Sequence, residues 1–147
     1  LFMEVANAEC CRQSDEAMDQ IDLEAPPREV LMQTGCHFVR FITSKFGQQI
    51  FCMCVAEKDR FPELGQQFYN SGPAVMRAEM AEYFEMAEAR GELRIKDKLL
   101  AADQFGDLCK ADIWTRLIFG VVQTVSEEEI HYVVENAVDT FLARYGV

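Results

Sequence analysis

The sequence predicts an all-α fold of six or seven helices. Apolar residues recur at steps of three and four along most of the chain, and no segment shows the alternation of a half-buried strand. Glycines and prolines stand where these periodic segments begin or end. With 147 residues, half of them hydrophobic, the chain is large enough for one domain with a buried core. We therefore expect one helical domain over residues 1–147.

The first part of the chain predicts three helices. Residues 1–20 are rich in the helix formers Ala, Met and Glu, and the proline pair at 26–27 suits a linker followed by a helix start. Over residues 28–46 apolar side chains return at helical spacing. We expect Gly47 to end this helix, because glycine readily adopts a left-handed conformation. A shorter helix is expected over residues 48–58.

The stretch RFPELGQQFYNSGP, residues 60–73, combines helical spacing with helix breakers. Pro62 suits the first turn of a helix, the Asn-Ser-Gly cluster at 70–72 interrupts that helix, and Pro73 suits the start of the next. The next helix is expected to run to about residue 90, where Gly91 stops it. A short helix thus turns a corner before a long helix lies back across the others.

Two further helices are expected in the C-terminal part. Asp97 can cap a helix that runs to about Phe119 and is closed by Gly120. The later part of this helix, IWTRLIFGVV, is apolar on nearly every side, which predicts burial from more than one direction. Ser126 and Glu129 form a capping-box pattern that opens the final helix.

The final helix carries a wide apolar face, which covers about half of its circumference at roughly 100° per residue. The core of one domain needs a narrower face. We therefore expect a second surface, most simply a second copy of the chain, to cover the rest. The predicted dimer-interface residues on the last two helices are Leu117, Val121, Ile130, Val134, Ala137 and Phe141.

The net charge of -11 excludes several function classes. Such an acidic surface repels phosphate backbones and anionic lipid, so we expect no binding of nucleic acid or membranes by this segment itself. No apolar run approaches the roughly 20 residues of a membrane span, and no signal peptide is visible. We expect a cytoplasmic protein. Because the chain begins with Leu1 rather than Met, we also expect that a preceding segment has been removed.

The six cysteines favour free thiols over disulfides. Cys10 and Cys11 are adjacent, and Cys52 and Cys54 are two apart, so the side chains of each pair diverge on a helix. The other two stand singly among apolar residues, where cysteine behaves as a small hydrophobic residue. We expect a reduced protein with buried thiols.

The Glu-x-x-His spacing of Glu128 and His131 is the pattern of di-iron helical bundles. Those sites need a second copy and two further glutamates, and the other histidine, His37, has no Glu three residues before it. A lone His such as His37 is more often satisfied by the protein than used for a ligand. A helical-bundle metal enzyme is therefore the alternative, and we expect no metal, no cofactor and no catalytic residue.

Three segments carry a family resemblance: RFPEL…FYNSGP, ARGELRIKDKLLAADQFGDLCKADIWTRLIFG and SEEEIHYVVENAVDTFLARYG. They resemble the C-terminal domain of TetR-family transcriptional regulators, and within it the AefR-like group, with its R-F-P-E-L…F-Y…G-P segment, R-G-E-L turn and closing F-L-x-x-Y-G. The resemblance is strong from about Glu57 to Gly146 and weaker before it. Residues 1–20 resemble the start of the helix that follows an N-terminal helix-turn-helix domain in this family.

The resemblance implies a regulatory domain. It would bind a small hydrophobic or amphipathic effector in an internal pocket and form a homodimer through a four-helix bundle of its last two helices. Effector binding would change the spacing of two DNA-binding heads. The helix-turn-helix domain that forms such a head is missing from this sequence, so DNA would be bound only through that missing domain.

The residues that are candidates for effector contact are Phe38, Phe41, Met80, Phe84, Phe105, Cys109 and Asp112. Aromatic and Met side chains are typical of a packed core as well as of a small-molecule cavity, and both interpretations stay open here. If these side chains pack without a void, a helical interaction domain without a ligand is a further alternative. Asp112 stands in a mostly apolar segment, where it either pairs with Arg40 or Arg116 or faces a polar cavity.

Overall fold

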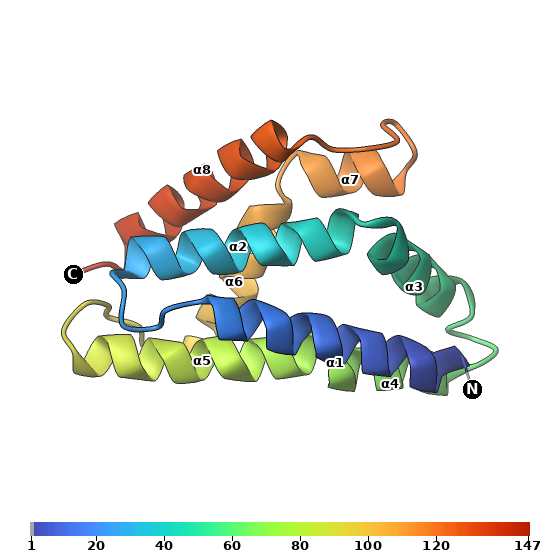
Figure 1. Cartoon of the computed structure of the whole chain (residues 1–147), viewed down its shortest axis with the longest axis horizontal. Helices are drawn as coiled ribbons and strands as arrows, with labels where there is room; N and C mark the ends of the chain where they lie inside the picture. Colours follow the sequence, from blue (N-terminus) through green and yellow to red (C-terminus); the bar gives the residue numbers. More distant parts are fainter. Residues whose placement is uncertain (1) are drawn as a thin grey trace.

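The computed structural model describes residues 2–147, except for the side chains at positions 2, 3, 14 and 18. This part of the chain forms eight α helices and no β strand, which confirms the all-α prediction (Figure 1). The helices are α1 (Phe2–Gln20), α2 (Pro27–Thr43), α3 (Lys45–Ala56), α4 (Pro62–Ser71), α5 (Pro73–Ala89), α6 (Lys98–Lys110), α7 (Ile113–Ile118) and α8 (Glu127–Tyr145). None of the helices described is long and apolar enough to cross a membrane.

The helix α6 lies at the centre of the packing, between α5 and α8, and it also contacts α2. In Figure 1, α6 passes behind α2 at a steep angle, while α2 and α8 lie next to each other. The first helix packs mainly on α4 and runs beside α5 (Figure 1). An isolated antiparallel bridge between Leu93 and Gly146 ties the end of α8 to the loop between α5 and α6.

The main core is centred on three phenylalanines from three helices. Phe141 of α8 stacks on Phe84 of α5 and meets Phe105 of α6 edge to face, with both pairs of ring centroids 5.4 Å apart. All three side chains are fully or almost fully buried. Burial of aromatic rings contributes strongly to stability, and this trio joins α5 and α8 to α6.

A second, smaller apolar cluster lies where α1, α3 and α4 meet. Its buried members are Ala6 and Cys10 of α1 with Ile50 and Cys54 of α3. The half-buried side chains packed against it are Phe41, Phe46, Met53 and Phe68. The N-terminal half of α1 is therefore anchored through this cluster rather than through the main core.

The boundary between α2 and α3 differs from the prediction that Gly47 ends a helix. The first helix of the pair already ends at Thr43, and Ser44 caps α3 by accepting a hydrogen bond of 3.0 Å from the Gly47 backbone N–H. Gly47 thus lies inside α3. A Cβ at this position would stand 2.2 Å from the Phe41 carbonyl oxygen, so glycine permits the close approach of the two helices.

The predicted single helix from Asp97 to Phe119 is also wrong, because the chain turns sharply at Asp112. This residue has φ 70° and ψ -44°, and the Ile113 N–H bonds to the Ala111 carbonyl oxygen at 2.8 Å, which makes Asp112 the central residue of a γ-turn. The chain continues as the short helix α7. Its apolar segment is not buried on every side, since Phe119 is 76% and Val121 is 69% exposed.

Other predicted boundaries are confirmed. Pro62 and Pro73 occupy the first turns of α4 and α5, and Gly91 after α5 has a positive φ of 77°. The Asp97 side chain caps α6, and Ser126 and Glu129 form the predicted capping box of α8. These signals are local, which is why the sequence reveals them.

The wide apolar face of α8 is covered within one chain. Ile130, Val134, Ala137 and Phe141 are each at most 3% exposed, because α8 lies across both α2 and α6. The expected surplus of apolar surface is therefore absent, and the assignment of these four residues to a dimer interface is wrong: they belong to the core. Leu117 of α7 is also buried, at 4% exposure.

Candidate functional site

The predicted effector-contact residues are divided among three places. Met80, Phe84, Phe105 and Cys109 come together in the main core, with Phe38 half-buried against them. A Cβ at Gly35 of α2 would stand 3.2 Å from Phe105 and 3.3 Å from the Cys109 Sγ, so the space between these side chains is tightly filled. The packed-core interpretation therefore describes this group.

The other two predicted contact residues lie elsewhere. Phe41 belongs to the second cluster, where its ring meets Phe46 edge to face with centroids 6.2 Å apart. Asp112 is exposed and pairs with Arg116 at 3.3 Å. Of the two alternatives for Asp112, a pair with an arginine or a polar cavity, the structure shows the pair, and its partner is Arg116.

The two histidines come from different helices. His37 of α2 is half-buried, and its burial, followed by the charge of Arg40, lowers its pKa. Glu128 and His131 are exposed on α8, with the His131 Nδ1 3.8 Å from Glu135. In the described part of the chain, no group of three or more His, Cys, Asp or Glu side chains converges as a metal site would require.

A hollow of about 470 Å³ opens between α1 and α5. It is lined by two carboxylates from α1, two from α5, a tyrosine and two apolar side chains: Asp15, Asp19, Glu79, Glu82, Tyr83, Leu23 and Met86. None of these residues was predicted as an effector contact. We call this site the acidic hollow.

The acidic hollow lies beside the C-terminal half of α1. Among the described side chains of residues 11–20, none is buried, whereas Ala6 and Cys10 earlier in the helix are. On α5, Glu79, Tyr83 and Met86 follow one another at steps of four and three, so they share one face of the helix. That face looks towards Asp15 and Asp19 of α1.

The carboxylates of the acidic hollow are not neutralised by basic side chains. In the part of the chain that the structure describes, no ion pair involves Asp15, Asp19, Glu79 or Glu82. Burial raises the pKa of Glu79, and the charges of Asp15 and Glu82 raise it further. The hollow is therefore a concentrated negative site.

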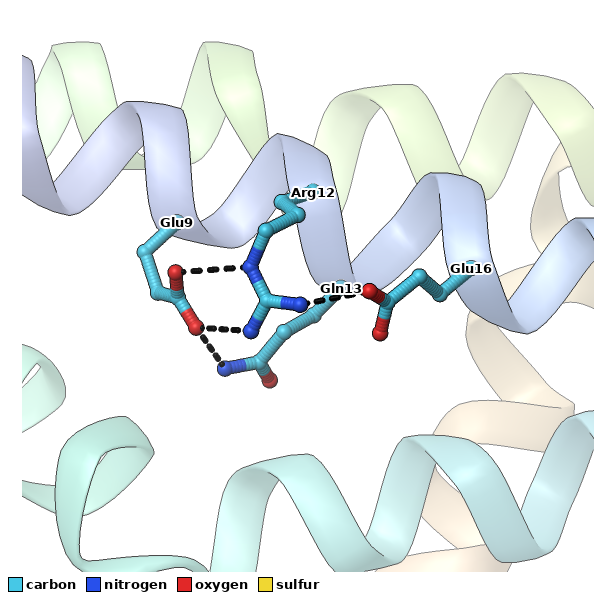
Figure 2. Close-up of polar contacts among 4 residues, drawn as sticks. All are labelled: Glu9, Arg12, Gln13 and Glu16. Carbon is cyan, nitrogen blue, oxygen red and sulfur yellow. Dashed lines mark hydrogen bonds and ion pairs between the residues drawn. The ribbon is translucent and has the colours of Figure 1, made fainter.

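Arginines near the hollow are engaged elsewhere. Arg12, the one basic residue in α1, lies between Glu9 and Glu16 and donates from its Nε to Glu9 at 2.9 Å (Figure 2). This bond holds the pKa of Glu9 at about 2. Arg90, which follows the C-terminal end of α5, donates to the Leu23 carbonyl oxygen and to Glu92.

Tyr83 contributes an unusual polar group to the wall of the hollow. Its side chain is only 5% exposed, and its hydroxyl is buried without a hydrogen-bond partner. Burial raises the pKa of Tyr83 to about 12, and the charge of Glu92 adds to this shift, while Arg90 opposes it through its charge and its closeness to the hydroxyl. An unpaired buried hydroxyl costs free energy.

The sequence contained a signal for this site. Asp15 and Asp19 are four residues apart, and so are Glu79 and Tyr83, within helices that were predicted as such. Like charges at this spacing, such as Asp15 and Asp19, lie on one helical face and destabilise it. Only the structure shows that the two faces meet.

Comparison with known proteins places the chain in a family. The family described as AefR-like transcriptional repressor, C-terminal domain, matches residues 29–147. The chain belongs to the TetR family of transcriptional regulators. No curated protein sequence matches it significantly.

Two solved structures of regulators share the fold. A putative TetR-family transcriptional regulator from Mesorhizobium loti MAFF303099 is 22% identical, with a TM-score of 0.79 over 99% of this chain and 70% of that protein. The flavonoid-responsive regulator FrrA is 24% identical, with a TM-score of 0.82 over 99% of this chain and 73% of that protein. The predicted resemblance is confirmed, and the family match reaches further towards the N-terminus than the strong motifs did.

The TetR-family domain leaves several large apolar side chains exposed near its C-terminal end. Phe119 and Val121 lie at the end of α7 and in the loop after it, and Tyr132 on the outer face of α8 is 69% exposed. Of the six predicted interface residues, Val121 is the one that remains accessible. Apart from Ala143, the remaining exposed residues of α8 are polar.

Proposed function

We propose that this TetR-family domain binds a small organic effector and pairs with a second copy of the chain. The family match over residues 29–147 is the observation that carries the proposal, because this C-terminal domain belongs to transcriptional repressors. Effector binding would shift the population of domain arrangements and, through α1, the spacing of the DNA-binding heads that TetR regulators carry. The acidic surface is consistent with DNA contact elsewhere.

The proposed dimer surface is formed by the α7–α8 loop and the outer face of α8. Phe119, Val121 and Tyr132 are large, apolar or aromatic, and exposed, as residues that a partner covers commonly are. A second copy would cover them by a two-fold arrangement, in which the same surface is used on both chains. This surface replaces the buried residues that the sequence pointed to.

Light scattering coupled to size-exclusion chromatography tests the dimer. At tens of micromolar the chain is expected to elute as a dimer, and the double variant Val121→Glu/Tyr132→Glu as a monomer. Val55→Glu serves as the matched control, because Val55 of α3 is also exposed but lies outside the proposed surface. A wild-type chain that is strictly monomeric at these concentrations contradicts the dimer.

The effector is proposed to be small, with an apolar part. One similar structure belongs to a flavonoid-responsive regulator, and its fold is shared here. A panel of flavonoids, amphipathic amines and fatty acids should contain at least one compound that raises the melting temperature, since binding to the folded state stabilises it by mass action. If every compound leaves the melting temperature unchanged, the effector-binding part of the proposal fails.

A further inference from the structure

We propose that the turn at Asp112 is a hinge between α6 and α7, and that its bent state places Phe119 and Val121 on the proposed dimer surface. In the alternative state α6 and α7 join into one straight helix, which carries these two side chains elsewhere. The inference concerns the regulation of the dimer, so it rests on the proposed function.

The first argument is the strain of the turn. Among the residues that the structure describes, Asp112 is the only one other than glycine with a positive φ. Its φ of 70° and ψ of -44° belong to a form of γ-turn that is rare and strained. Strain of this kind persists only where the surrounding structure enforces it, and it is common in segments that switch between two conformations.

The second argument is a conflict between local sequence and structure. Helical spacing continues through the turn, because buried residues follow one another at steps of four: Phe105, Cys109, Ile113 and Leu117. In Figure 1, α7 nevertheless leaves the end of α6 in a different direction. Joining the two helices would relieve the strain and give the first N–H groups of α7 partners in α6. The straight state therefore has local advantages that the bent state lacks.

The third argument is that contacts of α7 hold the turn in its bent state. Arg116 donates from its Nε to the Asp112 carbonyl oxygen at 2.9 Å and from a terminal nitrogen to the Asp112 carboxylate at 3.3 Å. Ile113 is fully buried in the main core, and Leu117 is 4% exposed. Burial of these two side chains offsets the backbone strain, so the bent state is the more populated one.

An aromatic contact connects the hinge to the rest of the domain. Trp114 of α7 meets Phe51 of α3 edge to face, with ring centroids 5.0 Å apart. The Lys110 ammonium of α6 lies 5.5 Å from the centre of the Trp114 ring and 6.0 Å from that of Phe38 in α2. Since α3 packs on α1 through the second cluster, a shift of α1 and α3 would change the support of α7.

Three variants of the 147-residue chain at position 112 test the hinge. Asp112→Gly, Asp112→Asn and Asp112→Ala all remove the charge that pairs with Arg116. Glycine and asparagine tolerate a positive φ better than alanine does, and alanine is the best helix former. Asp112→Ala should therefore shift the population towards the straight state, whereas the other two variants should remain bent.

Two readouts follow the hinge itself. Trp114 is the only tryptophan of the chain, and its fluorescence emission should move to longer wavelength in Asp112→Ala as it leaves Phe51. Hydrogen exchange measured by NMR shows whether the helices join. The amides of Trp114 and Thr115 in the first turn of α7 should exchange more slowly in Asp112→Ala, because a joined helix gives them partners. If emission and exchange are the same in all three variants, the turn does not move and the inference fails.

Analytical ultracentrifugation tests the link to the dimer. Asp112→Ala should raise the dimer dissociation constant about fivefold relative to Asp112→Gly. Phe51→Leu should also raise it, whereas Phe46→Leu should change it by less than about twofold, because the Phe46 ring lies in the same helix but contacts Phe41 instead of Trp114.

The outcomes separate this inference from the proposed function. A dimeric wild type whose dissociation constant is the same in every variant overturns the hinge and leaves the proposed dimer. Equal effects of Phe46→Leu and Phe51→Leu overturn the link through Trp114. A wild type that is strictly monomeric overturns both the dimer and its regulation.

Discussion

Gly35 of α2 lies so close to Val134 of α8 that a Cβ at position 35 would stand 2.7 Å from the Val134 Cγ1. The same methyl group would also press on Phe105 and on the Cys109 Sγ from α6. This close approach allows α8 to bury its wide apolar face against α2 and α6 within a single chain. The tight contact and the position of α8 therefore depend on one small residue.

Gly35→Ala is expected to destabilise the domain by about 1–3 kcal/mol, because overpacking a filled core forces neighbouring side chains and helices to shift. Gly65→Ala in α4 is the matched control, since nothing lies within 4 Å of a Cβ there. The control should gain roughly 0.5–1 kcal/mol from the better helix propensity of alanine. Urea unfolding of both variants measures the difference, and a Gly35→Ala variant as stable as the control would contradict the close contact.

Tyr83→Phe is expected to increase the free energy of unfolding by roughly 1 kcal/mol, because it removes a buried hydroxyl that has no partner. Tyr132→Phe, at an exposed position on α8, should change stability by less than about 0.5 kcal/mol. Thermal unfolding monitored by circular dichroism compares the two. Loss of stability in Tyr83→Phe would show that the hydroxyl is paired in solution.

The stability of the domain should respond to acid in two opposite ways. The raised pKa of Glu79 means that its contribution to stability is fully present below the unfolded value of about 4.5 and is lost as the pH rises through the folded value. The pKa of Glu127 is lowered by its hydrogen bond from Arg40, so its contribution is present above 4.5 and is lost as the pH falls through the folded value. Mild acidification should therefore reduce the charge repulsion at Glu79 before it breaks the Arg40–Glu127 ion pair.

Urea unfolding of single variants across this pH range separates the two effects. Glu79→Gln should be more stable than the wild type at neutral pH, and the difference should shrink as the pH approaches 4.5. Glu127→Gln should be less stable at neutral pH and converge with the wild type at more acidic pH. A Glu79→Gln variant that shows no gain at neutral pH would contradict the repulsion in the hollow.

The γ-turn at Asp112 predicts a difference between two substitutions. Asp112→Ala and Asp112→Gly both lose the exposed pair with Arg116, but only glycine adopts a positive φ without strain. The glycine variant should be the more stable by about 1 kcal/mol. Equal melting temperatures for the two variants would mean that the turn relaxes in solution and that α6 and α7 join.

Much of the helical organisation could be predicted from the sequence, because helix ends are marked by local chemistry. Pro62, Pro73, Asp97 and Ser126 each act on backbone groups within a few residues, and the structure confirms all four. The prediction failed at Gly47, where Ser44 provides the cap and glycine provides space. At this position glycine does not end a helix; it allows the backbone of α3 to lie close to the Phe41 carbonyl oxygen.

The site was harder to predict than the fold. Phe84 and Phe105 are typical of both a core and a cavity, and the side chains around them decide in favour of a core. The carboxylates of the acidic hollow come from helices about sixty residues apart in the chain, and sequence spacing says nothing about such a meeting.

The sequence by itself determined the all-α class, most helix boundaries, the acidic charge and the TetR-family membership, because these follow from local backbone chemistry, composition and motifs. Only the tertiary structure decided which surface covers each helix. The apolar arc of α8 has the same width whether a second chain or α2 and α6 cover it. The structure shows that α2 and α6 cover it, because both helices pack against α8. The same holds for α1, whose acidic face lines a hollow only because α5 lies opposite to it.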